Sequence, residues 1–205
     1  MLDIESWLSL WSRAVLDEFG DRVRFLGIQG SRARGEARED SDIDAVTVLD
    51  RLTPGDMARL RAALAGLPER DKLCGFVSGE AELRAWDASE LFQFCLDTRP
   101  VYGSLDFLPP PSREAALGSA RSGACALYHG CAHWLLHGGD EAEPEALEKA
   151  AFFTMRALVW LDTGNFPGSR AELPEKYRQA LASGPEELFE WASDVIKTYS
   201  KSKRR

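Results

Sequence analysis

Two carboxylates one residue apart, Asp42 and Asp44, are the side chains whose types and spacing best suit chemistry. Side chains alternate between the two faces of a strand, so a strand over residues 42–49 would point both carboxylates the same way. Two carboxylates on one face repel each other unless a cation lies between them. We expect Mg²⁺ here, because it prefers oxygen ligands and is commonly held by one or two carboxylates together with substrate phosphates.

A Gly-Ser turn, Gly30-Ser31, precedes the two carboxylates and is suited to holding phosphates. Glycine lets the backbone approach a phosphate closely, and both amides and the Ser31 hydroxyl can donate hydrogen bonds to it. Arg34, helped by Arg32, can offset the remaining negative charge. A cation on carboxylates beside a phosphate-binding turn is the arrangement of a phosphoryl-transfer site, whereas a solvated acidic turn is the alternative.

Composition narrows the class of protein. The 205 residues are 44% apolar and 28% charged, which suits one large globular domain or two small ones. A net charge of −8 argues against nucleic acid or an anionic membrane as partner, and the basic run at 201–205 is interpreted as a solvated tail. No apolar run approaches the roughly 20 residues of a membrane span, and acidic residues near the start argue against a secretory signal. The four cysteines have no Cys-x-x-Cys spacing, which predicts reduced thiols and a cytoplasmic protein.

The first half of the chain alternates helical and strand patterns. Asp3 is expected to cap a helix that ends at Gly20, and Thr53 to cap one that begins at Pro54 and ends before Gly66. Strands are predicted at 22–28, 42–49 and 73–78, a short helix at 33–39, and further strands or short helices at 91–96 and 101–102.

Three consecutive prolines in LPPPS, residues 108–112, mark the clearest boundary, because they cannot continue a helix or a central strand. Helices are predicted beyond it at 113–137, 144–163, 171–182 and 185–200. The predicted fold class is therefore α+β. A small mixed-sheet core would occupy residues 1–108, and an all-α helical bundle would occupy residues 113–205.

The stretch GSRARGEAREDSDIDAVTV resembles the core motif of the DNA polymerase beta-like nucleotidyltransferase superfamily, a Gly-Ser turn followed by Asp-x-Asp on a strand. Its GSxARG…SDID form looks like the minimal and the antibiotic nucleotidyltransferases. The resemblance implies that Gly30 and Ser31, with Arg34, hold nucleotide phosphates and that Asp42 and Asp44 ligate two Mg²⁺ ions. It also implies a reaction, in which a nucleoside monophosphate, AMP from ATP, passes to an acceptor hydroxyl and pyrophosphate leaves.

The family also uses a third carboxylate on a neighbouring strand, which completes one metal site and often activates the acceptor hydroxyl as a base. The expected third strand, LCGFVS at 73–78, contains no Asp or Glu. Glu80 and Glu82 follow it, and Asp97 ends the next apolar run. We assign the catalytic role to Asp97 and keep Glu80 and Glu82 as alternatives. If none of them reaches the metals, the chain is a catalytically weak nucleotide-binding regulatory protein.

The helical half resembles the substrate-side bundle of kanamycin-type and streptomycin-type nucleotidyltransferases, which implies a small-molecule acceptor, aminoglycoside-like, and a homodimer. Cys125, His129, His133 and His137 recur every four residues on one predicted helix. Zinc is an alternative for these side chains, but four-residue spacing drifts by about 40° per step on an α-helix, so all four cannot meet one ion. We predict instead that His129 and His133 contact the acceptor in a cleft between the domains.

Two rival functions stay open at this point. A protein-modifying nucleotidyltransferase of the antitoxin type would use the same chemistry on a tyrosine of a partner protein. The fused bundle argues against it, because such antitoxins are usually the bare core. The nucleotide-binding regulatory protein is the other rival. Nucleic-acid polymerisation is the least favoured function, because no basic surface is predicted that could follow a phosphate backbone.

Overall fold

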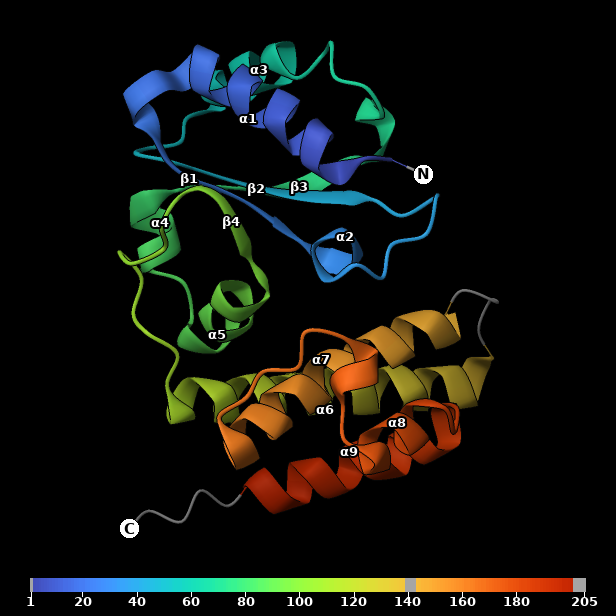
Figure 1. The fold of residues 1–205 in the computed structure, drawn as a ribbon. Helices are drawn as coiled ribbons and strands as arrows, with labels where there is room; N and C mark the ends of the chain where they lie inside the picture. The colour runs from blue at the N-terminus through green and yellow to red at the C-terminus, as the bar shows by residue number, and fades with distance from the viewer. Residues whose placement is uncertain (1, 139–142, 201–205) are drawn as a thin grey trace. The chain divides into compact units, whose positions relative to one another are not determined.

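The computed structural model describes residues 2–138 and 143–200, which form two compact units (Figure 1). The first unit comprises Met1–Trp86 and Asp97–Pro110, and the second comprises Asp87–Leu96 and Pro111–Arg205. The proline run therefore lies where the chain finally leaves the first unit. Residues 87–96 belong to the second unit, whereas the sequence prediction placed them in the first. The basic tail lies outside the described residues.

A four-stranded mixed sheet forms the centre of the first unit, with strand order β3-β2-β1-β4. The strands are β1 (Val23–Gln29), β2 (Ile43–Leu49), β3 (Leu73–Gly79) and β4 (Arg99–Gly103). β1 pairs with β2 and with β4 in antiparallel fashion, and β2 pairs with β3 in parallel. The helices of this unit are α1 (Ile4–Phe19), α2 (Gly30–Arg34), α3 (Pro54–Ala63) and α4 (Glu80–Arg84). The mixed sheet confirms the predicted α+β class.

One face of this sheet packs against α1 and α3 in an apolar core (Figure 1). The buried stripe of α1 is Trp7, Leu8, Trp11, Val15 and Phe19, which recur at helical spacing. Ile43 and Ala45 of β2 belong to the same core. Because side chains alternate along a strand, Asp44 points to the other face of the sheet. Burial of the apolar side chains therefore determines which face carries the carboxylates.

Capping side chains begin and end these helices where the sequence predicts. Asp3 accepts hydrogen bonds from the amides of Glu5 and Ser6, both at 3.2 Å, and Gly20 ends α1 at a φ of 53°. Thr53 and Asp56 form a reciprocal capping box at the start of α3.

The second unit is all-α and has its own core. Its helices are α5 (Ala88–Asp97), α6 (Arg113–His137), α7 (Glu143–Thr163), α8 (Glu175–Leu181) and α9 (Pro185–Ser200). The segment predicted as a strand or short helix at 91–96 is therefore helical. Phe92 explains why α5 belongs here, because its ring packs edge-on against Trp160 at 5.0 Å and Phe166 at 5.8 Å.

The cysteines and the lengths of the helices bear on two predictions made from the sequence. The four cysteines are free thiols, with Cys74 and Cys125 exposed and Cys131 buried. Among the described residues, none of the helices combines the length and the apolar character that crossing a bilayer requires.

Candidate active site

Gly30 and Asp44 meet where β1 passes into α2. The β1–β2 register pairs Gln29 with Asp44, so Gly30 follows directly beside the carboxylate. Gly30 has a φ of +72°, and a Cβ built on it would lie 1.9 Å from Oδ2 of Asp44. Only glycine satisfies both the backbone conformation and the close approach. The structure thus brings together the predicted turn and the predicted strand carboxylate. The short helix predicted at 33–39 instead spans Gly30–Arg34, so the Gly-Ser turn forms its first two residues.

Strand alternation places Asp44, whereas Asp42 directly precedes β2, which begins at Ile43 rather than at residue 42. Ile43 is fully buried in the core with α1, so Asp44 lies on the opposite face of the sheet. Asp44 is half-buried and Asp42 is exposed. The pair therefore has one member anchored beside the Gly30 turn and one that is accessible to solvent.

Arg32 has a structural role rather than the phosphate-neutralising role considered from the sequence. Its side chain is buried, and it donates from Nε to the carbonyl of Asp42 at 3.0 Å and from Nη2 to the carbonyl of Ser41 at 2.5 Å. These bonds fasten the loop that delivers Asp42 to the start of β2. Through its buried arginine, α2 therefore holds the backbone of the segment that contains Asp42.

Arg34, predicted to bind nucleotide, is engaged with carboxylates of its own unit. Its Nη1 lies 3.2 and 3.3 Å from the two oxygens of Asp97, and its Nε lies 3.1 Å from Oε2 of Glu36. The side chains of Arg34 and Asp97 are 11% and 9% exposed, so this ion pair is largely shielded from water. Any contact of Arg34 with a phosphate would therefore share the guanidinium with Asp97.

The position beside Asp44 on the neighbouring strand is occupied by Cys74. β3 pairs in parallel with β2, and the register places Cys74 next to Asp44 and Gly79 next to Leu49. Glu80 begins α4 after the far end of β3, six residues beyond Cys74, which corresponds to about 20 Å along an extended strand. Glu80 and Glu82 thus follow the end of the sheet opposite to Asp44, so neither can act as the third carboxylate.

Asp97 lies at the same end of the sheet as the Asp pair, but on the far side of β1. β4 runs antiparallel to β1 with Arg99 opposite Ile28, and Nε2 of Gln29 donates to Oγ1 of Thr98 at 2.5 Å. Two strand spacings, about 10 Å, separate β4 from β2. Gln29 was not predicted to matter, yet its side chain joins the end of β1 to Thr98, the residue before β4. The feature in the sequence that could have indicated it is a polar residue at the end of an apolar strand, directly before the Gly-Ser turn.

The donor set fits Mg²⁺ held partly by a substrate. Asp42 and Asp44 can supply carboxylate oxygens, and the Gly30-Ser31 turn beside Asp44 can offer backbone amides to a phosphate. Within residues 2–138 and 143–200, no three His, Cys, Asp or Glu side chains group together as a complete metal site. The described residues can therefore offer two carboxylates, and the substrate phosphates would supply further oxygen ligands.

The histidines of α6 do not gather into a site in the described structure. His129, His133, His137 and Cys125 are all exposed, and the rings of His133 and His137 lie 4.8 Å apart. Among the described residues, no three His, Cys, Asp or Glu side chains group together around this helix. The acceptor contacts of His129 and His133 stay a prediction.

Comparison with known proteins agrees with the geometry of the first unit. Residues 11–102 match the family described as nucleotidyltransferase domain. The matched stretch covers most of the first unit and residues 87–96 of the second, and it confirms the expected likeness to the nucleotidyltransferases of the DNA polymerase beta-like superfamily. No curated protein matches the chain.

The solved structures that are similar to the chain include an adenyltransferase and a toxin-antitoxin structure. A spectinomycin adenyltransferase, AAD(9), from Enterococcus faecialis, with ATP and spectinomycin, matches with a TM-score of 0.57 and 11% identity over 96% of this chain and 99% of that one. At this identity the match shows a shared fold. A toxin-antitoxin structure with AMP-PNP matches with 15% identity over 66% of this chain and 95% of that one, and its TM-score of 0.35 carries no argument.

Proposed function

We propose that this protein transfers a nucleoside monophosphate, AMP from ATP, to a hydroxyl group of a small-molecule acceptor in a Mg²⁺-dependent reaction. The observation that carries the proposal is the close approach of the Gly30 turn to Asp44, because it brings backbone amides that can donate to a phosphate beside a carboxylate that can hold a cation, within the stretch that matches a nucleotidyltransferase domain. The similar fold of an adenyltransferase with ATP supports ATP as the donor.

In the proposed reaction, the acceptor oxygen forms a bond to the α-phosphorus, and the bond from that phosphorus to the bridging oxygen breaks. Pyrophosphate leaves with the electron pair, and the hydroxyl proton passes to a base. Asp42 and Asp44 would hold Mg²⁺, which when bound stabilises negative charge on the transferred phosphate and the leaving group. Gly30 and Ser31 donate backbone hydrogen bonds to the phosphates, and the buried Arg32 keeps Asp42 in place.

Asp97 is our candidate for the base, and His129 and His133 are our candidates for acceptor contacts. Asp97 can accept the proton only if Arg34 gives up part of its hydrogen bonding, since both carboxylate oxygens are bonded in the structure. The acceptor is a small molecule in this proposal because the chain carries a complete helical unit with its own core.

A second function, nucleotide binding with weak or no catalysis, is favoured by one specific observation. Cys74 stands beside Asp44 on β3, at a place where a carboxylate would complete the set. In that case Mg²⁺ and ATP would bind through the Asp pair, and no acceptor would turn over.

The test measures pyrophosphate release from each of the four nucleoside triphosphates with Mg²⁺, in the presence of amine-bearing and neutral polyol acceptors. The variant is Asp42→Asn with Asp44→Asn, and the matched control is Asp40→Asn, whose side chain is 84% exposed. Acceptor-dependent release that the double variant loses and the control keeps supports the transferase. Mg²⁺-dependent ATP binding without release from any acceptor supports the second function, and release that appears only with a partner protein supports the antitoxin-type activity.

A further inference from the structure

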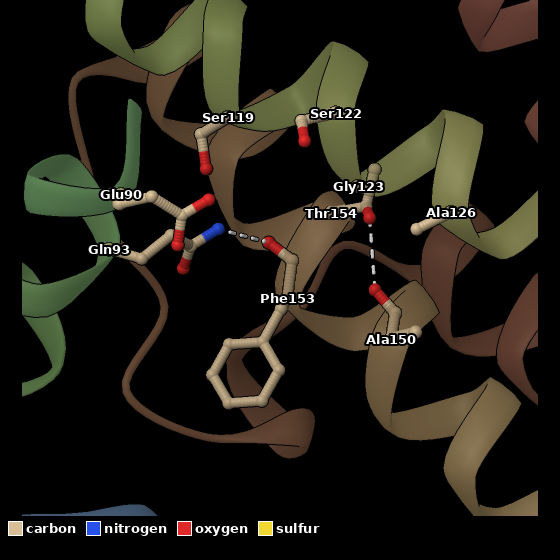
Figure 2. A pocket seen from close by; sticks show the side chains of 9 residues that line it. All are labelled: Glu90, Gln93, Ser119, Ser122, Gly123, Ala126, Ala150, Phe153 and Thr154. Carbon is tan, nitrogen blue, oxygen red and sulfur yellow. Dashed lines mark hydrogen bonds between the residues drawn. The ribbon is translucent and has the colours of Figure 1, made fainter. Parts of the chain in front are cut away.

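A cavity of about 350 Å³ lies within the second unit, among α5, α6 and α7 (Figure 2). Its lining consists of Glu90, Gln93, Ser119, Ser122, Gly123, Ala126, Ala150, Phe153 and Thr154. This volume is at the lower end of the range of small-molecule sites, about 300 to 1,000 Å³. The cavity therefore has room for a compact ligand of one or two rings.

Two glycines of α6 bring the walls of the cavity together. A Cβ on Gly118 would lie 2.9 Å from Cβ of Ser89 on α5, and a Cβ on Gly123 would lie 2.4 Å from Oγ1 of Thr154 on α7. Such distances mean that each neighbouring helix is packed as closely to α6 as glycine allows. The small residues Ser119 and Ser122 lie on α6 in the same stretch, so the space arises where closely packed helices carry short side chains.

Gln93, in the wall of this cavity, carries an unsatisfied hydrogen-bond acceptor. Its Nε2 donates to the backbone carbonyl of Phe153 at 2.9 Å, which joins α5 to α7 and fixes the amide orientation, because only the NH₂ group can donate to a carbonyl. Its Oε1 is buried and has no partner among the described residues. A buried acceptor left unpaired destabilises the folded chain, and a ligand N–H or O–H group that reached it would remove that cost.

The remaining polar groups of the cavity favour a ligand that is rich in donors and positively charged. Glu90 brings an exposed carboxylate, for which the described part of the chain provides no ion pair. The Thr154 hydroxyl already donates to the carbonyl of Ala150 at 2.9 Å, so its oxygen is left to accept. No lysine or arginine lines the cavity. A carboxylate, an amide oxygen and hydroxyl oxygens together select against an anion and suit a protonated amine with neighbouring hydroxyls.

We infer that this cavity binds a ring bearing a protonated amine and adjacent hydroxyls, with the amine on Glu90 and a hydroxyl or amine donor on Oε1 of Gln93. The inference rests on the proposed function in one respect, which is that this ligand would be the acceptor of the transferred nucleotide. Binding itself requires neither Mg²⁺ nor ATP.

The test is direct binding to the full-length protein, without nucleotide or Mg²⁺, by calorimetry and by amide hydrogen exchange of α5, α6 and α7. The probes are 2-deoxystreptamine, which has amines and hydroxyls on one ring, myo-inositol, which has hydroxyls only, and 1,3-diaminocyclohexane, which has amines only. We expect 2-deoxystreptamine to bind most tightly and to slow exchange around the cavity. Glu90→Gln should weaken its binding about tenfold, because it removes a charge-assisted hydrogen bond.

Two variants sharpen the result. Gln93→Leu removes the unpaired oxygen with a side chain of similar size and should also weaken the binding of 2-deoxystreptamine. Glu190→Gln on α9 removes an exposed carboxylate that does not line the cavity, and it should leave this binding unchanged. Equal binding of myo-inositol, or unchanged binding in Glu90→Gln, would overturn the inference, as would exchange protection confined to helices other than α5, α6 and α7.

Failure of the inference and failure of the proposed function give different results. Binding of 2-deoxystreptamine that persists in the Asp42→Asn, Asp44→Asn variant, with no AMP transfer by the wild type to any acceptor, leaves the cavity as a binding site and rejects the transferase. Transfer of AMP to an acceptor that is insensitive to both Glu90→Gln and Gln93→Leu keeps the transferase and rejects the cavity.

Discussion

At the scale of single residues, Gly30 controls the candidate active site most directly, because its missing side chain is the space that Asp44 occupies. Gly30→Ala should destabilise the protein by about 1 to 3 kcal/mol, the usual cost of a non-glycine residue in a left-handed conformation. It should also lower nucleotidyl transfer strongly, since its Cβ would push Asp44 aside. Urea unfolding and pyrophosphate release measure the two effects. Gly66→Ala is the control, because Gly66 has nothing within 4 Å of a built Cβ, and a similar loss there would contradict the argument.

The Arg34–Asp97 pair can be separated into a structural and a chemical contribution. Asp97→Asn should lower kcat by about a hundredfold or more if Asp97 takes the proton. Arg34→Gln should mainly raise KM for ATP if the guanidinium contacts phosphate. Because the pair is largely buried, a double-mutant cycle on unfolding free energy should give a coupling of about 0.5 to 3 kcal/mol.

The decisive comparison in this cycle is between activity and stability. If Asp97→Asn loses only as much activity as its fraction of unfolded protein explains, Asp97 is a partner of Arg34 and not the base. The nucleotide-binding alternative then gains support, because Cys74 is the other residue beside the Asp pair.

Strand alternation made the placement of Asp44 predictable, since it needs only the local pattern of Ile43 and Ala45. The roles of Arg32 and Arg34 were not predictable in this way. Both arginines lie in one acidic stretch, and the sequence does not reveal that one fastens the loop before β2 while the other meets Asp97, which is 63 residues away. Pairing across such a separation depends on how β4 returns to β1.

At the scale of elements, a charged network joins the start of α3 to β1. Nη1 of Arg22 donates to Asp56 at 2.7 Å and its Nε donates to Asp50 at 3.0 Å, while Asp56 also accepts from Thr53. Hydrogen bonds from Arg22, followed by those from Thr53, hold the pKa of Asp56 well below its ordinary value. The Thr53 cap that the sequence predicted is therefore part of a capping box with Asp56 that also anchors α3 to the sheet.

This network should make stability depend on pH in a defined direction. A depressed pKa contributes stability that is present above the unfolded value, about 3.9, and is lost as the pH falls through the folded value. We therefore expect Asp56→Asn to be less stable than the wild type at pH 6, with the difference shrinking towards pH 3. Urea midpoints at several pH values measure this. Asp40→Asn, at an exposed site, should show no such convergence, and a constant difference for Asp56→Asn would refute the linkage.

The contact of α6 with α7 gives a second prediction at this scale. Gly123→Ala should destabilise the helical unit, because its Cβ would lie 2.4 Å from Oγ1 of Thr154. Combined with Thr154→Ala, which removes that hydroxyl, the same substitution should become neutral or stabilising by up to about 1 kcal/mol, the helix propensity difference between alanine and glycine. Thermal unfolding of the four proteins completes the cycle, and a purely additive result would exclude the proposed clash.

Helix limits in the second half were predictable because α6 and α9 follow long apolar patterns with capping residues at their ends. The segment of α5 was ambiguous, since LFQFCL suits a strand as well as a helix. Its assignment to the second unit depends on Phe92 meeting Trp160 and Phe166, which follow it by more than 60 residues. The cavity beneath α5 was unpredictable for the same reason.

At the scale of the whole molecule, the chain has two apolar cores with no shared residues, one under α1 and the sheet and one within the helical bundle. Each unit can therefore respond to its own ligand. Two cores also mean that unfolding need not follow a single cooperative transition, so one midpoint describes the whole protein only where the two units unfold together. A ligand that binds one folded unit stabilises it by RT ln(1 + [L]/Kd), and that stabilisation reaches the other unit only through coupling.

Hydrogen exchange of the full chain can test this independence. Mg²⁺ with a non-hydrolysable ATP analogue should slow exchange in β1, α2 and β2, because we propose that the phosphates and the ion bind at Gly30, Asp42 and Asp44. 2-Deoxystreptamine alone should slow exchange in α5, α6 and α7 and leave the sheet unchanged. In the Asp42→Asn, Asp44→Asn variant, the first effect should vanish and the second should persist. Protection of the sheet by the amine probe without nucleotide would mean that the units are coupled before ATP binds, and protection of neither unit by its own ligand would reject both sites at once.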